Sequence, residues 1–176
     1  MDHLWSPWRL QYVTGGTARP GCVFCAATDD DGQAALVVHR GTTAYVILNL
    51  FPYNNGHLMV VPYRHIASLV DATPEELLEL VTLTRASEHV LRDAYEPQGL
   101  NVGLNLGKAA GAGVADHLHI HLVPRWTGDT NFMTTTGGTR VLPETLDATA
   151  ARLRPLFGAR VDADAASGTP AAGGQG

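Results

Sequence analysis

Short apolar runs along the chain predict five β-strands. The runs are rich in Val, Leu, Ile and Tyr, and Gly, Asn or Pro bounds them, which is typical of strands separated by turns. They are Ala35–His39, Ala44–Asn49, His57–Pro62, Leu100–Leu106 and His117–Pro124. We expect these strands to form one sheet.

A helical pattern lies between the third and fourth predicted strands. Thr73 at the N-cap, Pro74 at the first helical position and Glu76 three residues after the cap form the pattern of a capping box. The side chains expected to pack on the sheet recur at steps of three, four and seven along residues 74–95. They are Leu77, Leu80, Val81, Thr84 and Leu91.

The remainder of the chain predicts a second, shorter helix and a tail. This helix should open after Pro143 and end near Phe157, and small polar residues that cannot form a core follow from about Val161. We expect one domain over residues 1–158 and a flexible Ala/Gly-rich tail over residues 159–176. Strand hairpins, one long helix and further strands indicate an α+β fold with an antiparallel sheet.

Composition narrows the class of function. The 176 residues are 45% hydrophobic and 16% charged, and the formal net charge of −5 argues against a surface for a nucleic-acid polymer. The chain opens without a basic segment followed by an apolar one, and no run approaches the roughly 18 apolar residues of a membrane span. We therefore expect a soluble, cytoplasmic protein.

Three histidines alternate with apolar residues in the last predicted strand. His117, His119 and His121 should share one face, about 6–7 Å apart in successive steps, opposite an apolar face. Each imidazole has a donor and an acceptor that need partners, so three in alternation are not explained by packing. Two chemistries remain open: a metal bound by imidazoles, or imidazole catalysis on a phosphoryl group.

A glycine-rich segment precedes the histidines. Four glycines surround Asn105 within residues 101–113, and their exposed N–H groups could cradle a phosphate beside the histidine strand. A flexible connection between two strands is the alternative interpretation. Lys108 could add a charge for an anion, or it could be a solvated loop residue.

Cys22 and Cys25 are the two cysteines of the chain, and their spacing is that of a metal or redox pair. A reduced pair packed as small apolar side chains is the other possibility.

The segment from His117 to Val123 resembles the His-φ-His-φ-His-φ-φ signature of the histidine triad (HIT) family of nucleotide hydrolases and transferases. Further similarity lies in residues 49–62, 4–7, 124–126 and 128–132. With these segments the chain is similar, over about residues 4–157, to the diadenosine tetraphosphate phosphorylase group of that family. The resemblance implies a HIT-like fold.

The resemblance also implies roles for single residues. His119 would be the nucleophile that becomes nucleotidylated, and His121 would contact the phosphate or the leaving-group oxygen. His57 and Asn105 would orient the phosphate, and Asn49 would hold the ribose hydroxyls. Backbone N–H groups of the nucleotide-binding loop would come from Gly111, Gly113 and Val114.

For the metal, the resemblance implies a structural zinc ion bound by Cys22, Cys25, His65 and His117, with no organic cofactor. Four protein ligands close a tetrahedral site and leave no open position for catalysis. It further implies a homodimer in which the sheets combine across the interface.

The function implied is cleavage of diadenosine tetraphosphate, with inorganic phosphate as the acceptor, to ATP and ADP. Composition and spacing do not decide between this and several alternatives. The alternatives are a HIT nucleotide hydrolase, a purine nucleoside phosphoramidase, an enzyme with one catalytic ion bound by all three imidazoles, and a nucleotide-binding regulator without turnover.

Overall fold

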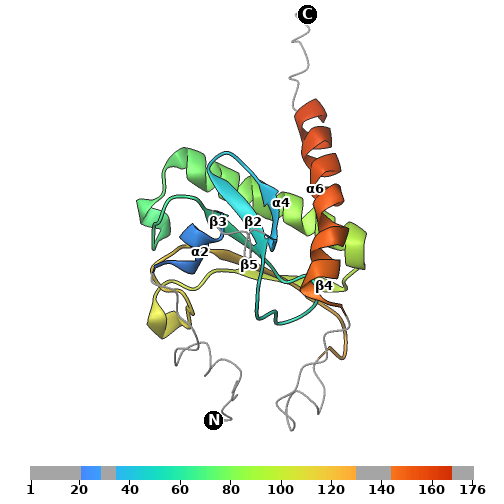
Figure 1. The fold of residues 1–176 in the computed structure, drawn as a ribbon, viewed down its shortest axis with the longest axis horizontal. Helices are drawn as coiled ribbons and strands as arrows, with labels where there is room; N and C mark the ends of the chain where they lie inside the picture. Colours follow the sequence, from blue (N-terminus) through green and yellow to red (C-terminus); the bar gives the residue numbers. More distant parts are fainter. Residues whose placement is uncertain (1–20, 29–34, 130–143, 168–176) are drawn as a thin grey trace, which may run out of the picture.

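The chain folds around a five-stranded antiparallel sheet (Figure 1). The computed structural model describes residues 21–28, 35–129 and 144–167, with side chains as far as residue 160. The strand order is β1-β2-β3-β5-β4. The strands are β1 (Val37–Arg40), β2 (Ala44–Leu48), β3 (Leu58–Pro62), β4 (Gly99–Gly103) and β5 (Ile120–Arg125). The predicted α+β class and antiparallel sheet are confirmed.

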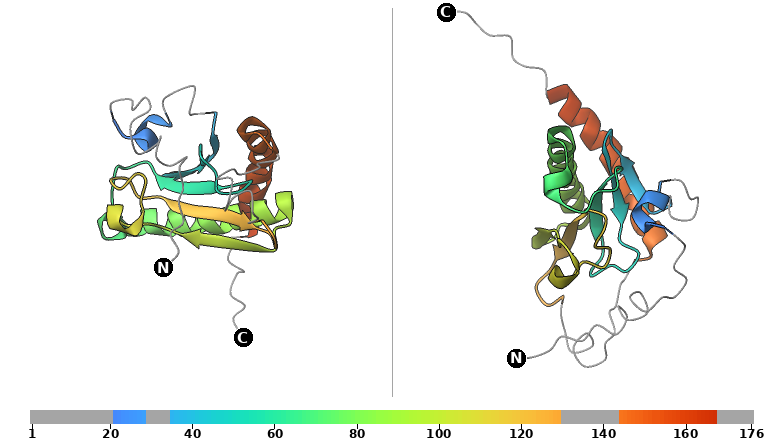
Figure 2. Two further views of the ribbon diagram at one scale, coloured as in Figure 1. Left: turned by 90° about the horizontal axis from the view of Figure 1, so that it is seen from below. Right: turned by 90° about the vertical axis from the view of Figure 1, so that its left-hand side faces the viewer.

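Two long helices cover one face of the sheet, and a short helix lies on the other. Helix α4 (Pro74–Tyr95) packs on β2, β3 and β5, and α6 (Leu146–Ser167) packs beside α4 and against β1. Helix α2 (Val23–Ala26) lies on the side of the sheet opposite α4 (Figure 2). Two short 3-10 helices, η1 (Leu69–Asp71) and η2 (Lys108–Ala110), lie in the connections.

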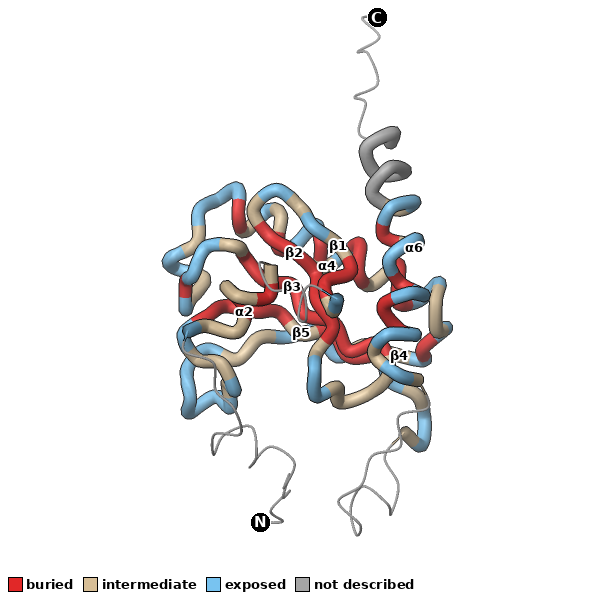
Figure 3. Tube along the Cα trace, viewed as in Figure 1, coloured by how far each residue is buried: buried red, intermediate tan, exposed pale blue. Residues whose placement is uncertain are grey.

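Each face of the sheet has its own apolar cluster, because successive strand residues point to opposite faces. Buried residues concentrate in the central strands and between them and the helices (Figure 3). The larger cluster joins the sheet to α4 and α6 and includes Val46, Val60, Leu80, Leu122 and Phe157. The smaller cluster lies between α2 and the sheet and consists of Phe24, Ala27, Val37, Tyr45, Ile47, Met59 and Val61.

Helix α4 begins as predicted, but its packing face is rotated from the predicted one. Thr73 and Glu76 form the reciprocal bonds of the capping box. Leu80 and Leu91 are buried as expected, whereas Val81 is 65% exposed. Successive helical residues turn by about 100°, so Val81 lies off the stripe that Leu80 belongs to. The buried stripe instead takes in Leu83, Ala86, Ser87 and Val90, while Leu77 and Thr84 flank it half-buried.

Most strand ends lie within two residues of the predicted ones, but three predicted boundaries are wrong by three residues or more. Strand β4 ends at Gly103 rather than Leu106, because a glycine-rich segment follows. Strand β5 begins at Ile120 rather than His117, because Leu118 N–H donates to Ile66 O, 2.6 Å away, outside the sheet ladder. Helix α6 is 22 residues long, as long as α4, and continues past Phe157 to Ser167.

The alanines of residues 163–166 have high helix propensity, which accounts for the extension of α6 into the segment predicted as a tail. Residues 168–176, 4–7 and 130–132 lie outside the described residues. Within the described ranges, neither α4 nor α6 is apolar enough over its length to cross a bilayer.

Candidate active site and metal centre

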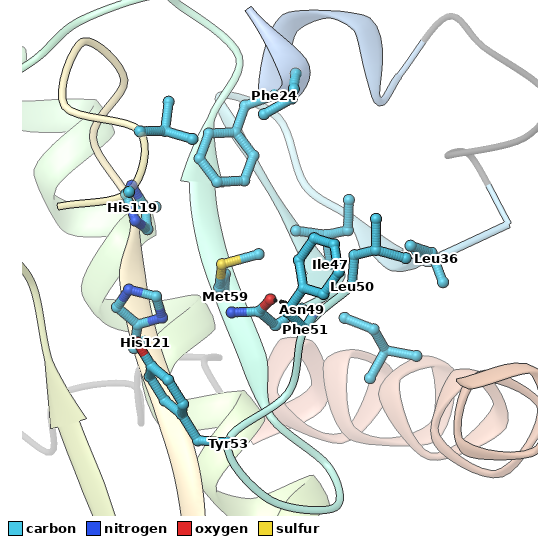
Figure 4. Close-up of a pocket in the computed structure, with 14 residues that line it drawn as sticks. Phe24, Leu36, Ile47, Asn49, Leu50, Phe51, Tyr53, Met59, His119 and His121 are labelled. Atoms are coloured by element: carbon cyan, nitrogen blue, oxygen red, sulfur yellow. Dashed lines mark hydrogen bonds between the residues drawn. The ribbon is translucent and has the colours of Figure 1, made fainter. Parts of the chain in front are cut away.

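A pocket opens on the face of the sheet opposite α4. Figure 4 shows His119 and His121 along one side, Phe24 at one end and Tyr53 at the other, with Ile47, Phe51 and Leu36 across from the histidines. Its lining is mostly apolar and consists of Val23, Phe24, Leu36, Ile47, Leu48, Asn49, Leu50, Phe51, Tyr53, Met59, Gly113, Val114, His119 and His121. The arrangement suits a ligand with an apolar, flat part and a polar part near the imidazoles.

The alternation predicted for the histidine segment holds even where the segment precedes β5. Leu118, Ile120 and Leu122 belong to the cluster under α4 and α6. The three histidines lie on the other side, with the rings of His119 and His121 4.8 Å apart. One side of the segment therefore stabilises the fold, and the other presents imidazoles.

The ring of His119 is fixed by the backbone of its own segment. Nδ1 lies 2.8 Å from His117 O, and a carbonyl accepts but cannot donate, so Nδ1 carries the proton of the neutral ring. The side chain is buried, and burial lowers the pKa of His119, with the bond to the His117 carbonyl opposing this shift. The neutral ring then keeps a lone pair on Nε2.

A chain of hydrogen bonds fixes the tautomer of His121. Tyr53 N–H donates to His57 Nδ1 over 3.0 Å, so the neutral His57 ring carries its proton on Nε2. His57 Nε2 lies 3.0 Å from His121 Nδ1 and donates to it, and the proton of His121 is therefore on Nε2. Neutral His119 and His121 thus have opposite tautomers: one offers a lone pair at Nε2, and the other a proton.

Four side chains form a second cluster at the start of the histidine segment. The ligand atoms of Cys22, Cys25, His65 and His117 all lie within 4.8 Å of one another. Cys22 Sγ is 3.2 Å from His117 Nδ1, and Cys25 Sγ is 3.3 Å from His65 Nδ1 and 3.6 Å from His117 Nδ1. Tetrahedral zinc with bonds of about 2.3 Å to sulfur and 2.0 Å to nitrogen places those atoms about 3.5 Å apart.

The tautomer of His117 also suits a metal ligand. Its Nε2 lies 2.9 Å from Pro62 O and donates to it, which leaves the lone pair on Nδ1, beside the sulfurs. These four residues could hold a metal ion, and the donor set and spacing fit zinc. The four predicted ligands, from three separate segments of the chain, are thus brought together.

Helix α2 connects this cluster with the pocket. Phe24 lies between the two cysteines, and its ring centroid is 5.5 Å from that of His117 and 4.9 Å from that of His119. Its carbonyl accepts a hydrogen bond from the Tyr45 hydroxyl over 2.7 Å. A change in the position of α2 would therefore also change the wall of the pocket.

The other predicted site residues divide into two groups. Asn49, Gly113 and Val114 line the pocket. Asn105 and Gly111 are not among its lining residues. His57 does not line the pocket either, but it contacts three residues that do: His121, Tyr53 and, over 3.5 Å, Asn49. Sequence reasoning missed Phe24 and Tyr53 as pocket residues, although Phe24 stands inside the Cys-x-x-Cys pair and Tyr53 lies four residues before His57.

Comparisons with known proteins agree with this geometry. A family model described as the HIT domain matches residues 32–128. The chain is 44% identical over 154 residues to the AP-4-A phosphorylase of Mycobacterium tuberculosis. The aligned segment covers 83% of this chain and 79% of the relative. It is 34% identical over 93 residues to the bis(5'-nucleosyl)-tetraphosphatase (asymmetrical) of Schizosaccharomyces pombe, over 53% of this chain and 50% of the relative.

A solved structure of a zinc-bound histidine triad family protein from Mycobacterium smegmatis has a similar fold. The TM-score is 0.65 at 29% identity, and the match covers 82% of this chain and 97% of that chain. The family-model match and the similarity to the mycobacterial phosphorylase lead to one conclusion: the chain belongs to the HIT domain family and is a nucleotide-processing enzyme.

Proposed function

We propose that the protein cleaves dinucleoside polyphosphates by phosphorolysis, converting diadenosine tetraphosphate and inorganic phosphate to ATP and ADP. The observation that carries the proposal is the pair of opposite tautomers, with a lone pair at His119 Nε2 and a proton at His121 Nε2, in one pocket. The 44% identity to the AP-4-A phosphorylase of M. tuberculosis supports the choice of substrate.

In the first half-reaction, His119 Nε2 attacks an α-phosphorus and forms a P–N bond as the bond from that phosphorus to the bridging oxygen breaks. The products are adenylyl-His119 and ATP. His121 Nε2–H lies beside this centre and donates a hydrogen bond to the departing oxygen. The apolar side of the pocket takes the base, and Asn49 binds the ribose hydroxyls.

In the second half-reaction, an oxygen of inorganic phosphate attacks the same phosphorus. The P–N bond breaks, the electron pair returns to His119 Nε2, and ADP leaves. Backbone N–H groups of Gly113 and Val114, which line the pocket, contact the phosphate in both steps. Asn105, Lys108 and Gly111 belong to the same glycine-rich segment but do not line the pocket, so in this proposal they would contact the outer phosphates beyond it.

A structural zinc ion is part of the proposal. Cys22, Cys25, His65 and His117 would hold it, and it would fix α2 and the start of the histidine segment without taking part in the reaction. The zinc-bound relative from M. smegmatis supports this assignment.

We also assign a homodimer, in which β4 meets a second copy of itself. Strand β4 is at one end of the strand order, and Val102 is 50% exposed there. A solution mass from light scattering tests the assignment.

Isotopically labelled phosphate tests the proposed function. With diadenosine tetraphosphate as substrate, the label should appear in ADP, and the rate should saturate with phosphate. Hydrolysis is the second candidate, because the tetraphosphatase of S. pombe is 34% identical over part of the chain. Unlabelled AMP and ATP, formed at a rate independent of phosphate, would contradict phosphorolysis and assign the protein to the hydrolases.

A further inference from the structure

The tautomer of His121 depends on a turn that the proposed chemistry does not itself use. His57 is buried, and it accepts from Tyr53 N–H and donates to His121. Tyr53 and His57 are the two ends of the turn Tyr53–His57. A displacement of Tyr53 N–H away from His57 Nδ1 would release the His57 ring, and with it the donor–acceptor order at His121.

Asn54 is the residue that holds the turn in place. Its carbonyl accepts from His57 N–H over 3.2 Å, which closes the turn, and Gly56 within it has a φ of +71°, a conformation that favours glycine. The Asn54 side chain reaches out of the turn, and Nδ2 donates to Pro124 O over 3.2 Å and to Asp129 Oδ2 over 3.0 Å. The turn is thereby tied to the end of β5.

The Asp129 carboxylate is itself rigidly held. Arg125 donates to it through Nε and through a terminal nitrogen, each over 2.6 Å, and Trp126 N–H donates over 3.1 Å. The Asp129 side chain is 11% exposed. A second terminal nitrogen of Arg125 donates to Asn101 Oδ1 over 3.0 Å, which joins the group to β4. A bidentate guanidinium pair fixes both the position and the plane of the carboxylate.

We infer that Asp129 is a positioning residue for the active site. Its carboxylate holds Asn54, Asn54 sets the turn, Tyr53 N–H sets the ring of His57, and His57 keeps the proton of His121 on the Nε2 side that faces the substrate. The inference rests on the proposed function for the role of His121 in the reaction. Its structural part, the dependence of two histidine tautomers on Asp129, stands without it.

The substitution Asp129→Asn tests the inference, because it keeps the size of the side chain but replaces one acceptor oxygen with a donor. A control variant, Asn101→Ala, removes another side-chain partner of Arg125 without touching the turn. A second variant, Asn54→Ala, removes the donor of the hydrogen bond between Asn54 Nδ2 and the Asp129 carboxylate. Thermal unfolding of each variant shows that it is folded before it is used.

The first readout is the ¹⁵N spectrum of the histidine rings in the free protein. The native enzyme and Asn101→Ala should show single tautomers for His57 and His121, both protonated on Nε2. Asp129→Asn and Asn54→Ala should show averaged tautomers at these two rings. His119 is an internal control, because its Nδ1–H is held by His117 O and should be unchanged in every variant.

The second readout is the division of the kinetic effect between kcat and KM. Displacement of a donor that acts on the leaving group lowers kcat by about tenfold or more and leaves KM within about twofold, whereas a general loss of the pocket raises KM. If Asp129→Asn has the same ¹⁵N spectrum and the same kinetics as the native enzyme, the inference is overturned. Asp129-dependent tautomers in a protein that does not cleave dinucleoside tetraphosphates would contradict the proposed function and leave the structural part intact.

Discussion

The two faces of the sheet are stabilised in different ways. On one face, the 22-residue helix α4 has a capping box, and with α6 it buries a large apolar cluster. On the other face, α2 has four residues and no side-chain cap bond. A helix of one turn is not stable by itself in water, so its position depends on Phe24 packing and on the cysteine and histidine side chains beside it.

The residues that contribute most to the stability of the fold and the residues of the candidate site therefore lie on different faces of the sheet. The face under α4 and α6 carries most of the buried apolar residues, and the pocket and the cysteine–histidine cluster lie on the opposite face. Substitutions on the two faces should therefore change different measured quantities.

The largest expected effect is on the pocket face. His119→Ala removes the proposed nucleophile, and kcat should fall by about 10³-fold or more, while the pocket still binds AMP in calorimetry. Most of the activity remaining in His119→Ala would contradict the assignment of the nucleophile.

The matched substitution on the helical face is Leu80→Ala. Leu80 is 1% exposed, and loss of its side chain should lower the free energy of unfolding by about 2–5 kcal/mol. Denaturant titration measures this loss, and kcat at a temperature where the variant is folded should be unchanged. If kcat falls by a large factor along with the free energy of unfolding, the two faces are not independent.

A substitution on the pocket face should also lower the stability of the fold when it removes a proposed metal ligand. In Cys22→Ser the zinc content should fall together with the melting temperature, by more than about 5 °C, because the binding free energy of a structural metal contributes to folding. Elemental analysis and calorimetry measure the two quantities. Leu80→Ala is the control, since it should lose stability and keep its metal. Full zinc occupancy in Cys22→Ser would show that the ligand set is wrong.

The smallest effect concerns the capping box of α4. Arg64 donates to Glu76 through Nε and a terminal nitrogen, and this pairing, with the Thr73 N–H bond, lowers the pKa of Glu76 from 4.5 to about 2. The ionised carboxylate therefore stabilises the fold above pH 4.5, and this contribution is lost as the pH falls from 4.5 towards 2.

Glu76→Gln keeps the capping pattern but removes the charge. The native protein should melt about 1–3 °C above the variant at pH 7, a small margin because Arg64 is half-exposed. Melting curves from pH 7 to pH 3 should show this margin shrinking. A margin that is constant over that range would exclude the ion pair as its cause.

The sequence predicts best those features that depend on local patterns. The capping box at Thr73 and the alternation through the histidine segment are local, and the structure has both. The buried stripe of α4 was predicted less well, because the sheet and α6 decide which of several apolar positions, such as Leu83 or Val81, is covered.

Site features that depend on distant partners were beyond the sequence. Nothing in the spacing of Tyr53 and His57 shows that a backbone N–H fixes an imidazole tautomer, and nothing near Asp129 shows that it binds Asn54, 75 positions away. The cysteine–histidine cluster could be predicted because the resemblance to the family supplied the pairing of Cys22 and Cys25 with two remote histidines.

The proposal that distinguishes the pocket face most sharply from the helical face is covalent chemistry at His119. Its most direct test is to mix the enzyme with diadenosine tetraphosphate in the absence of phosphate, quench with alkali, which preserves a P–N bond, and analyse the peptides by mass spectrometry. We expect one adenylyl group on His119 and none in the His119→Ala variant. Rapid turnover on mixing with phosphate but no adenylyl group at His119, or an adenylyl group at His121 instead, would contradict it.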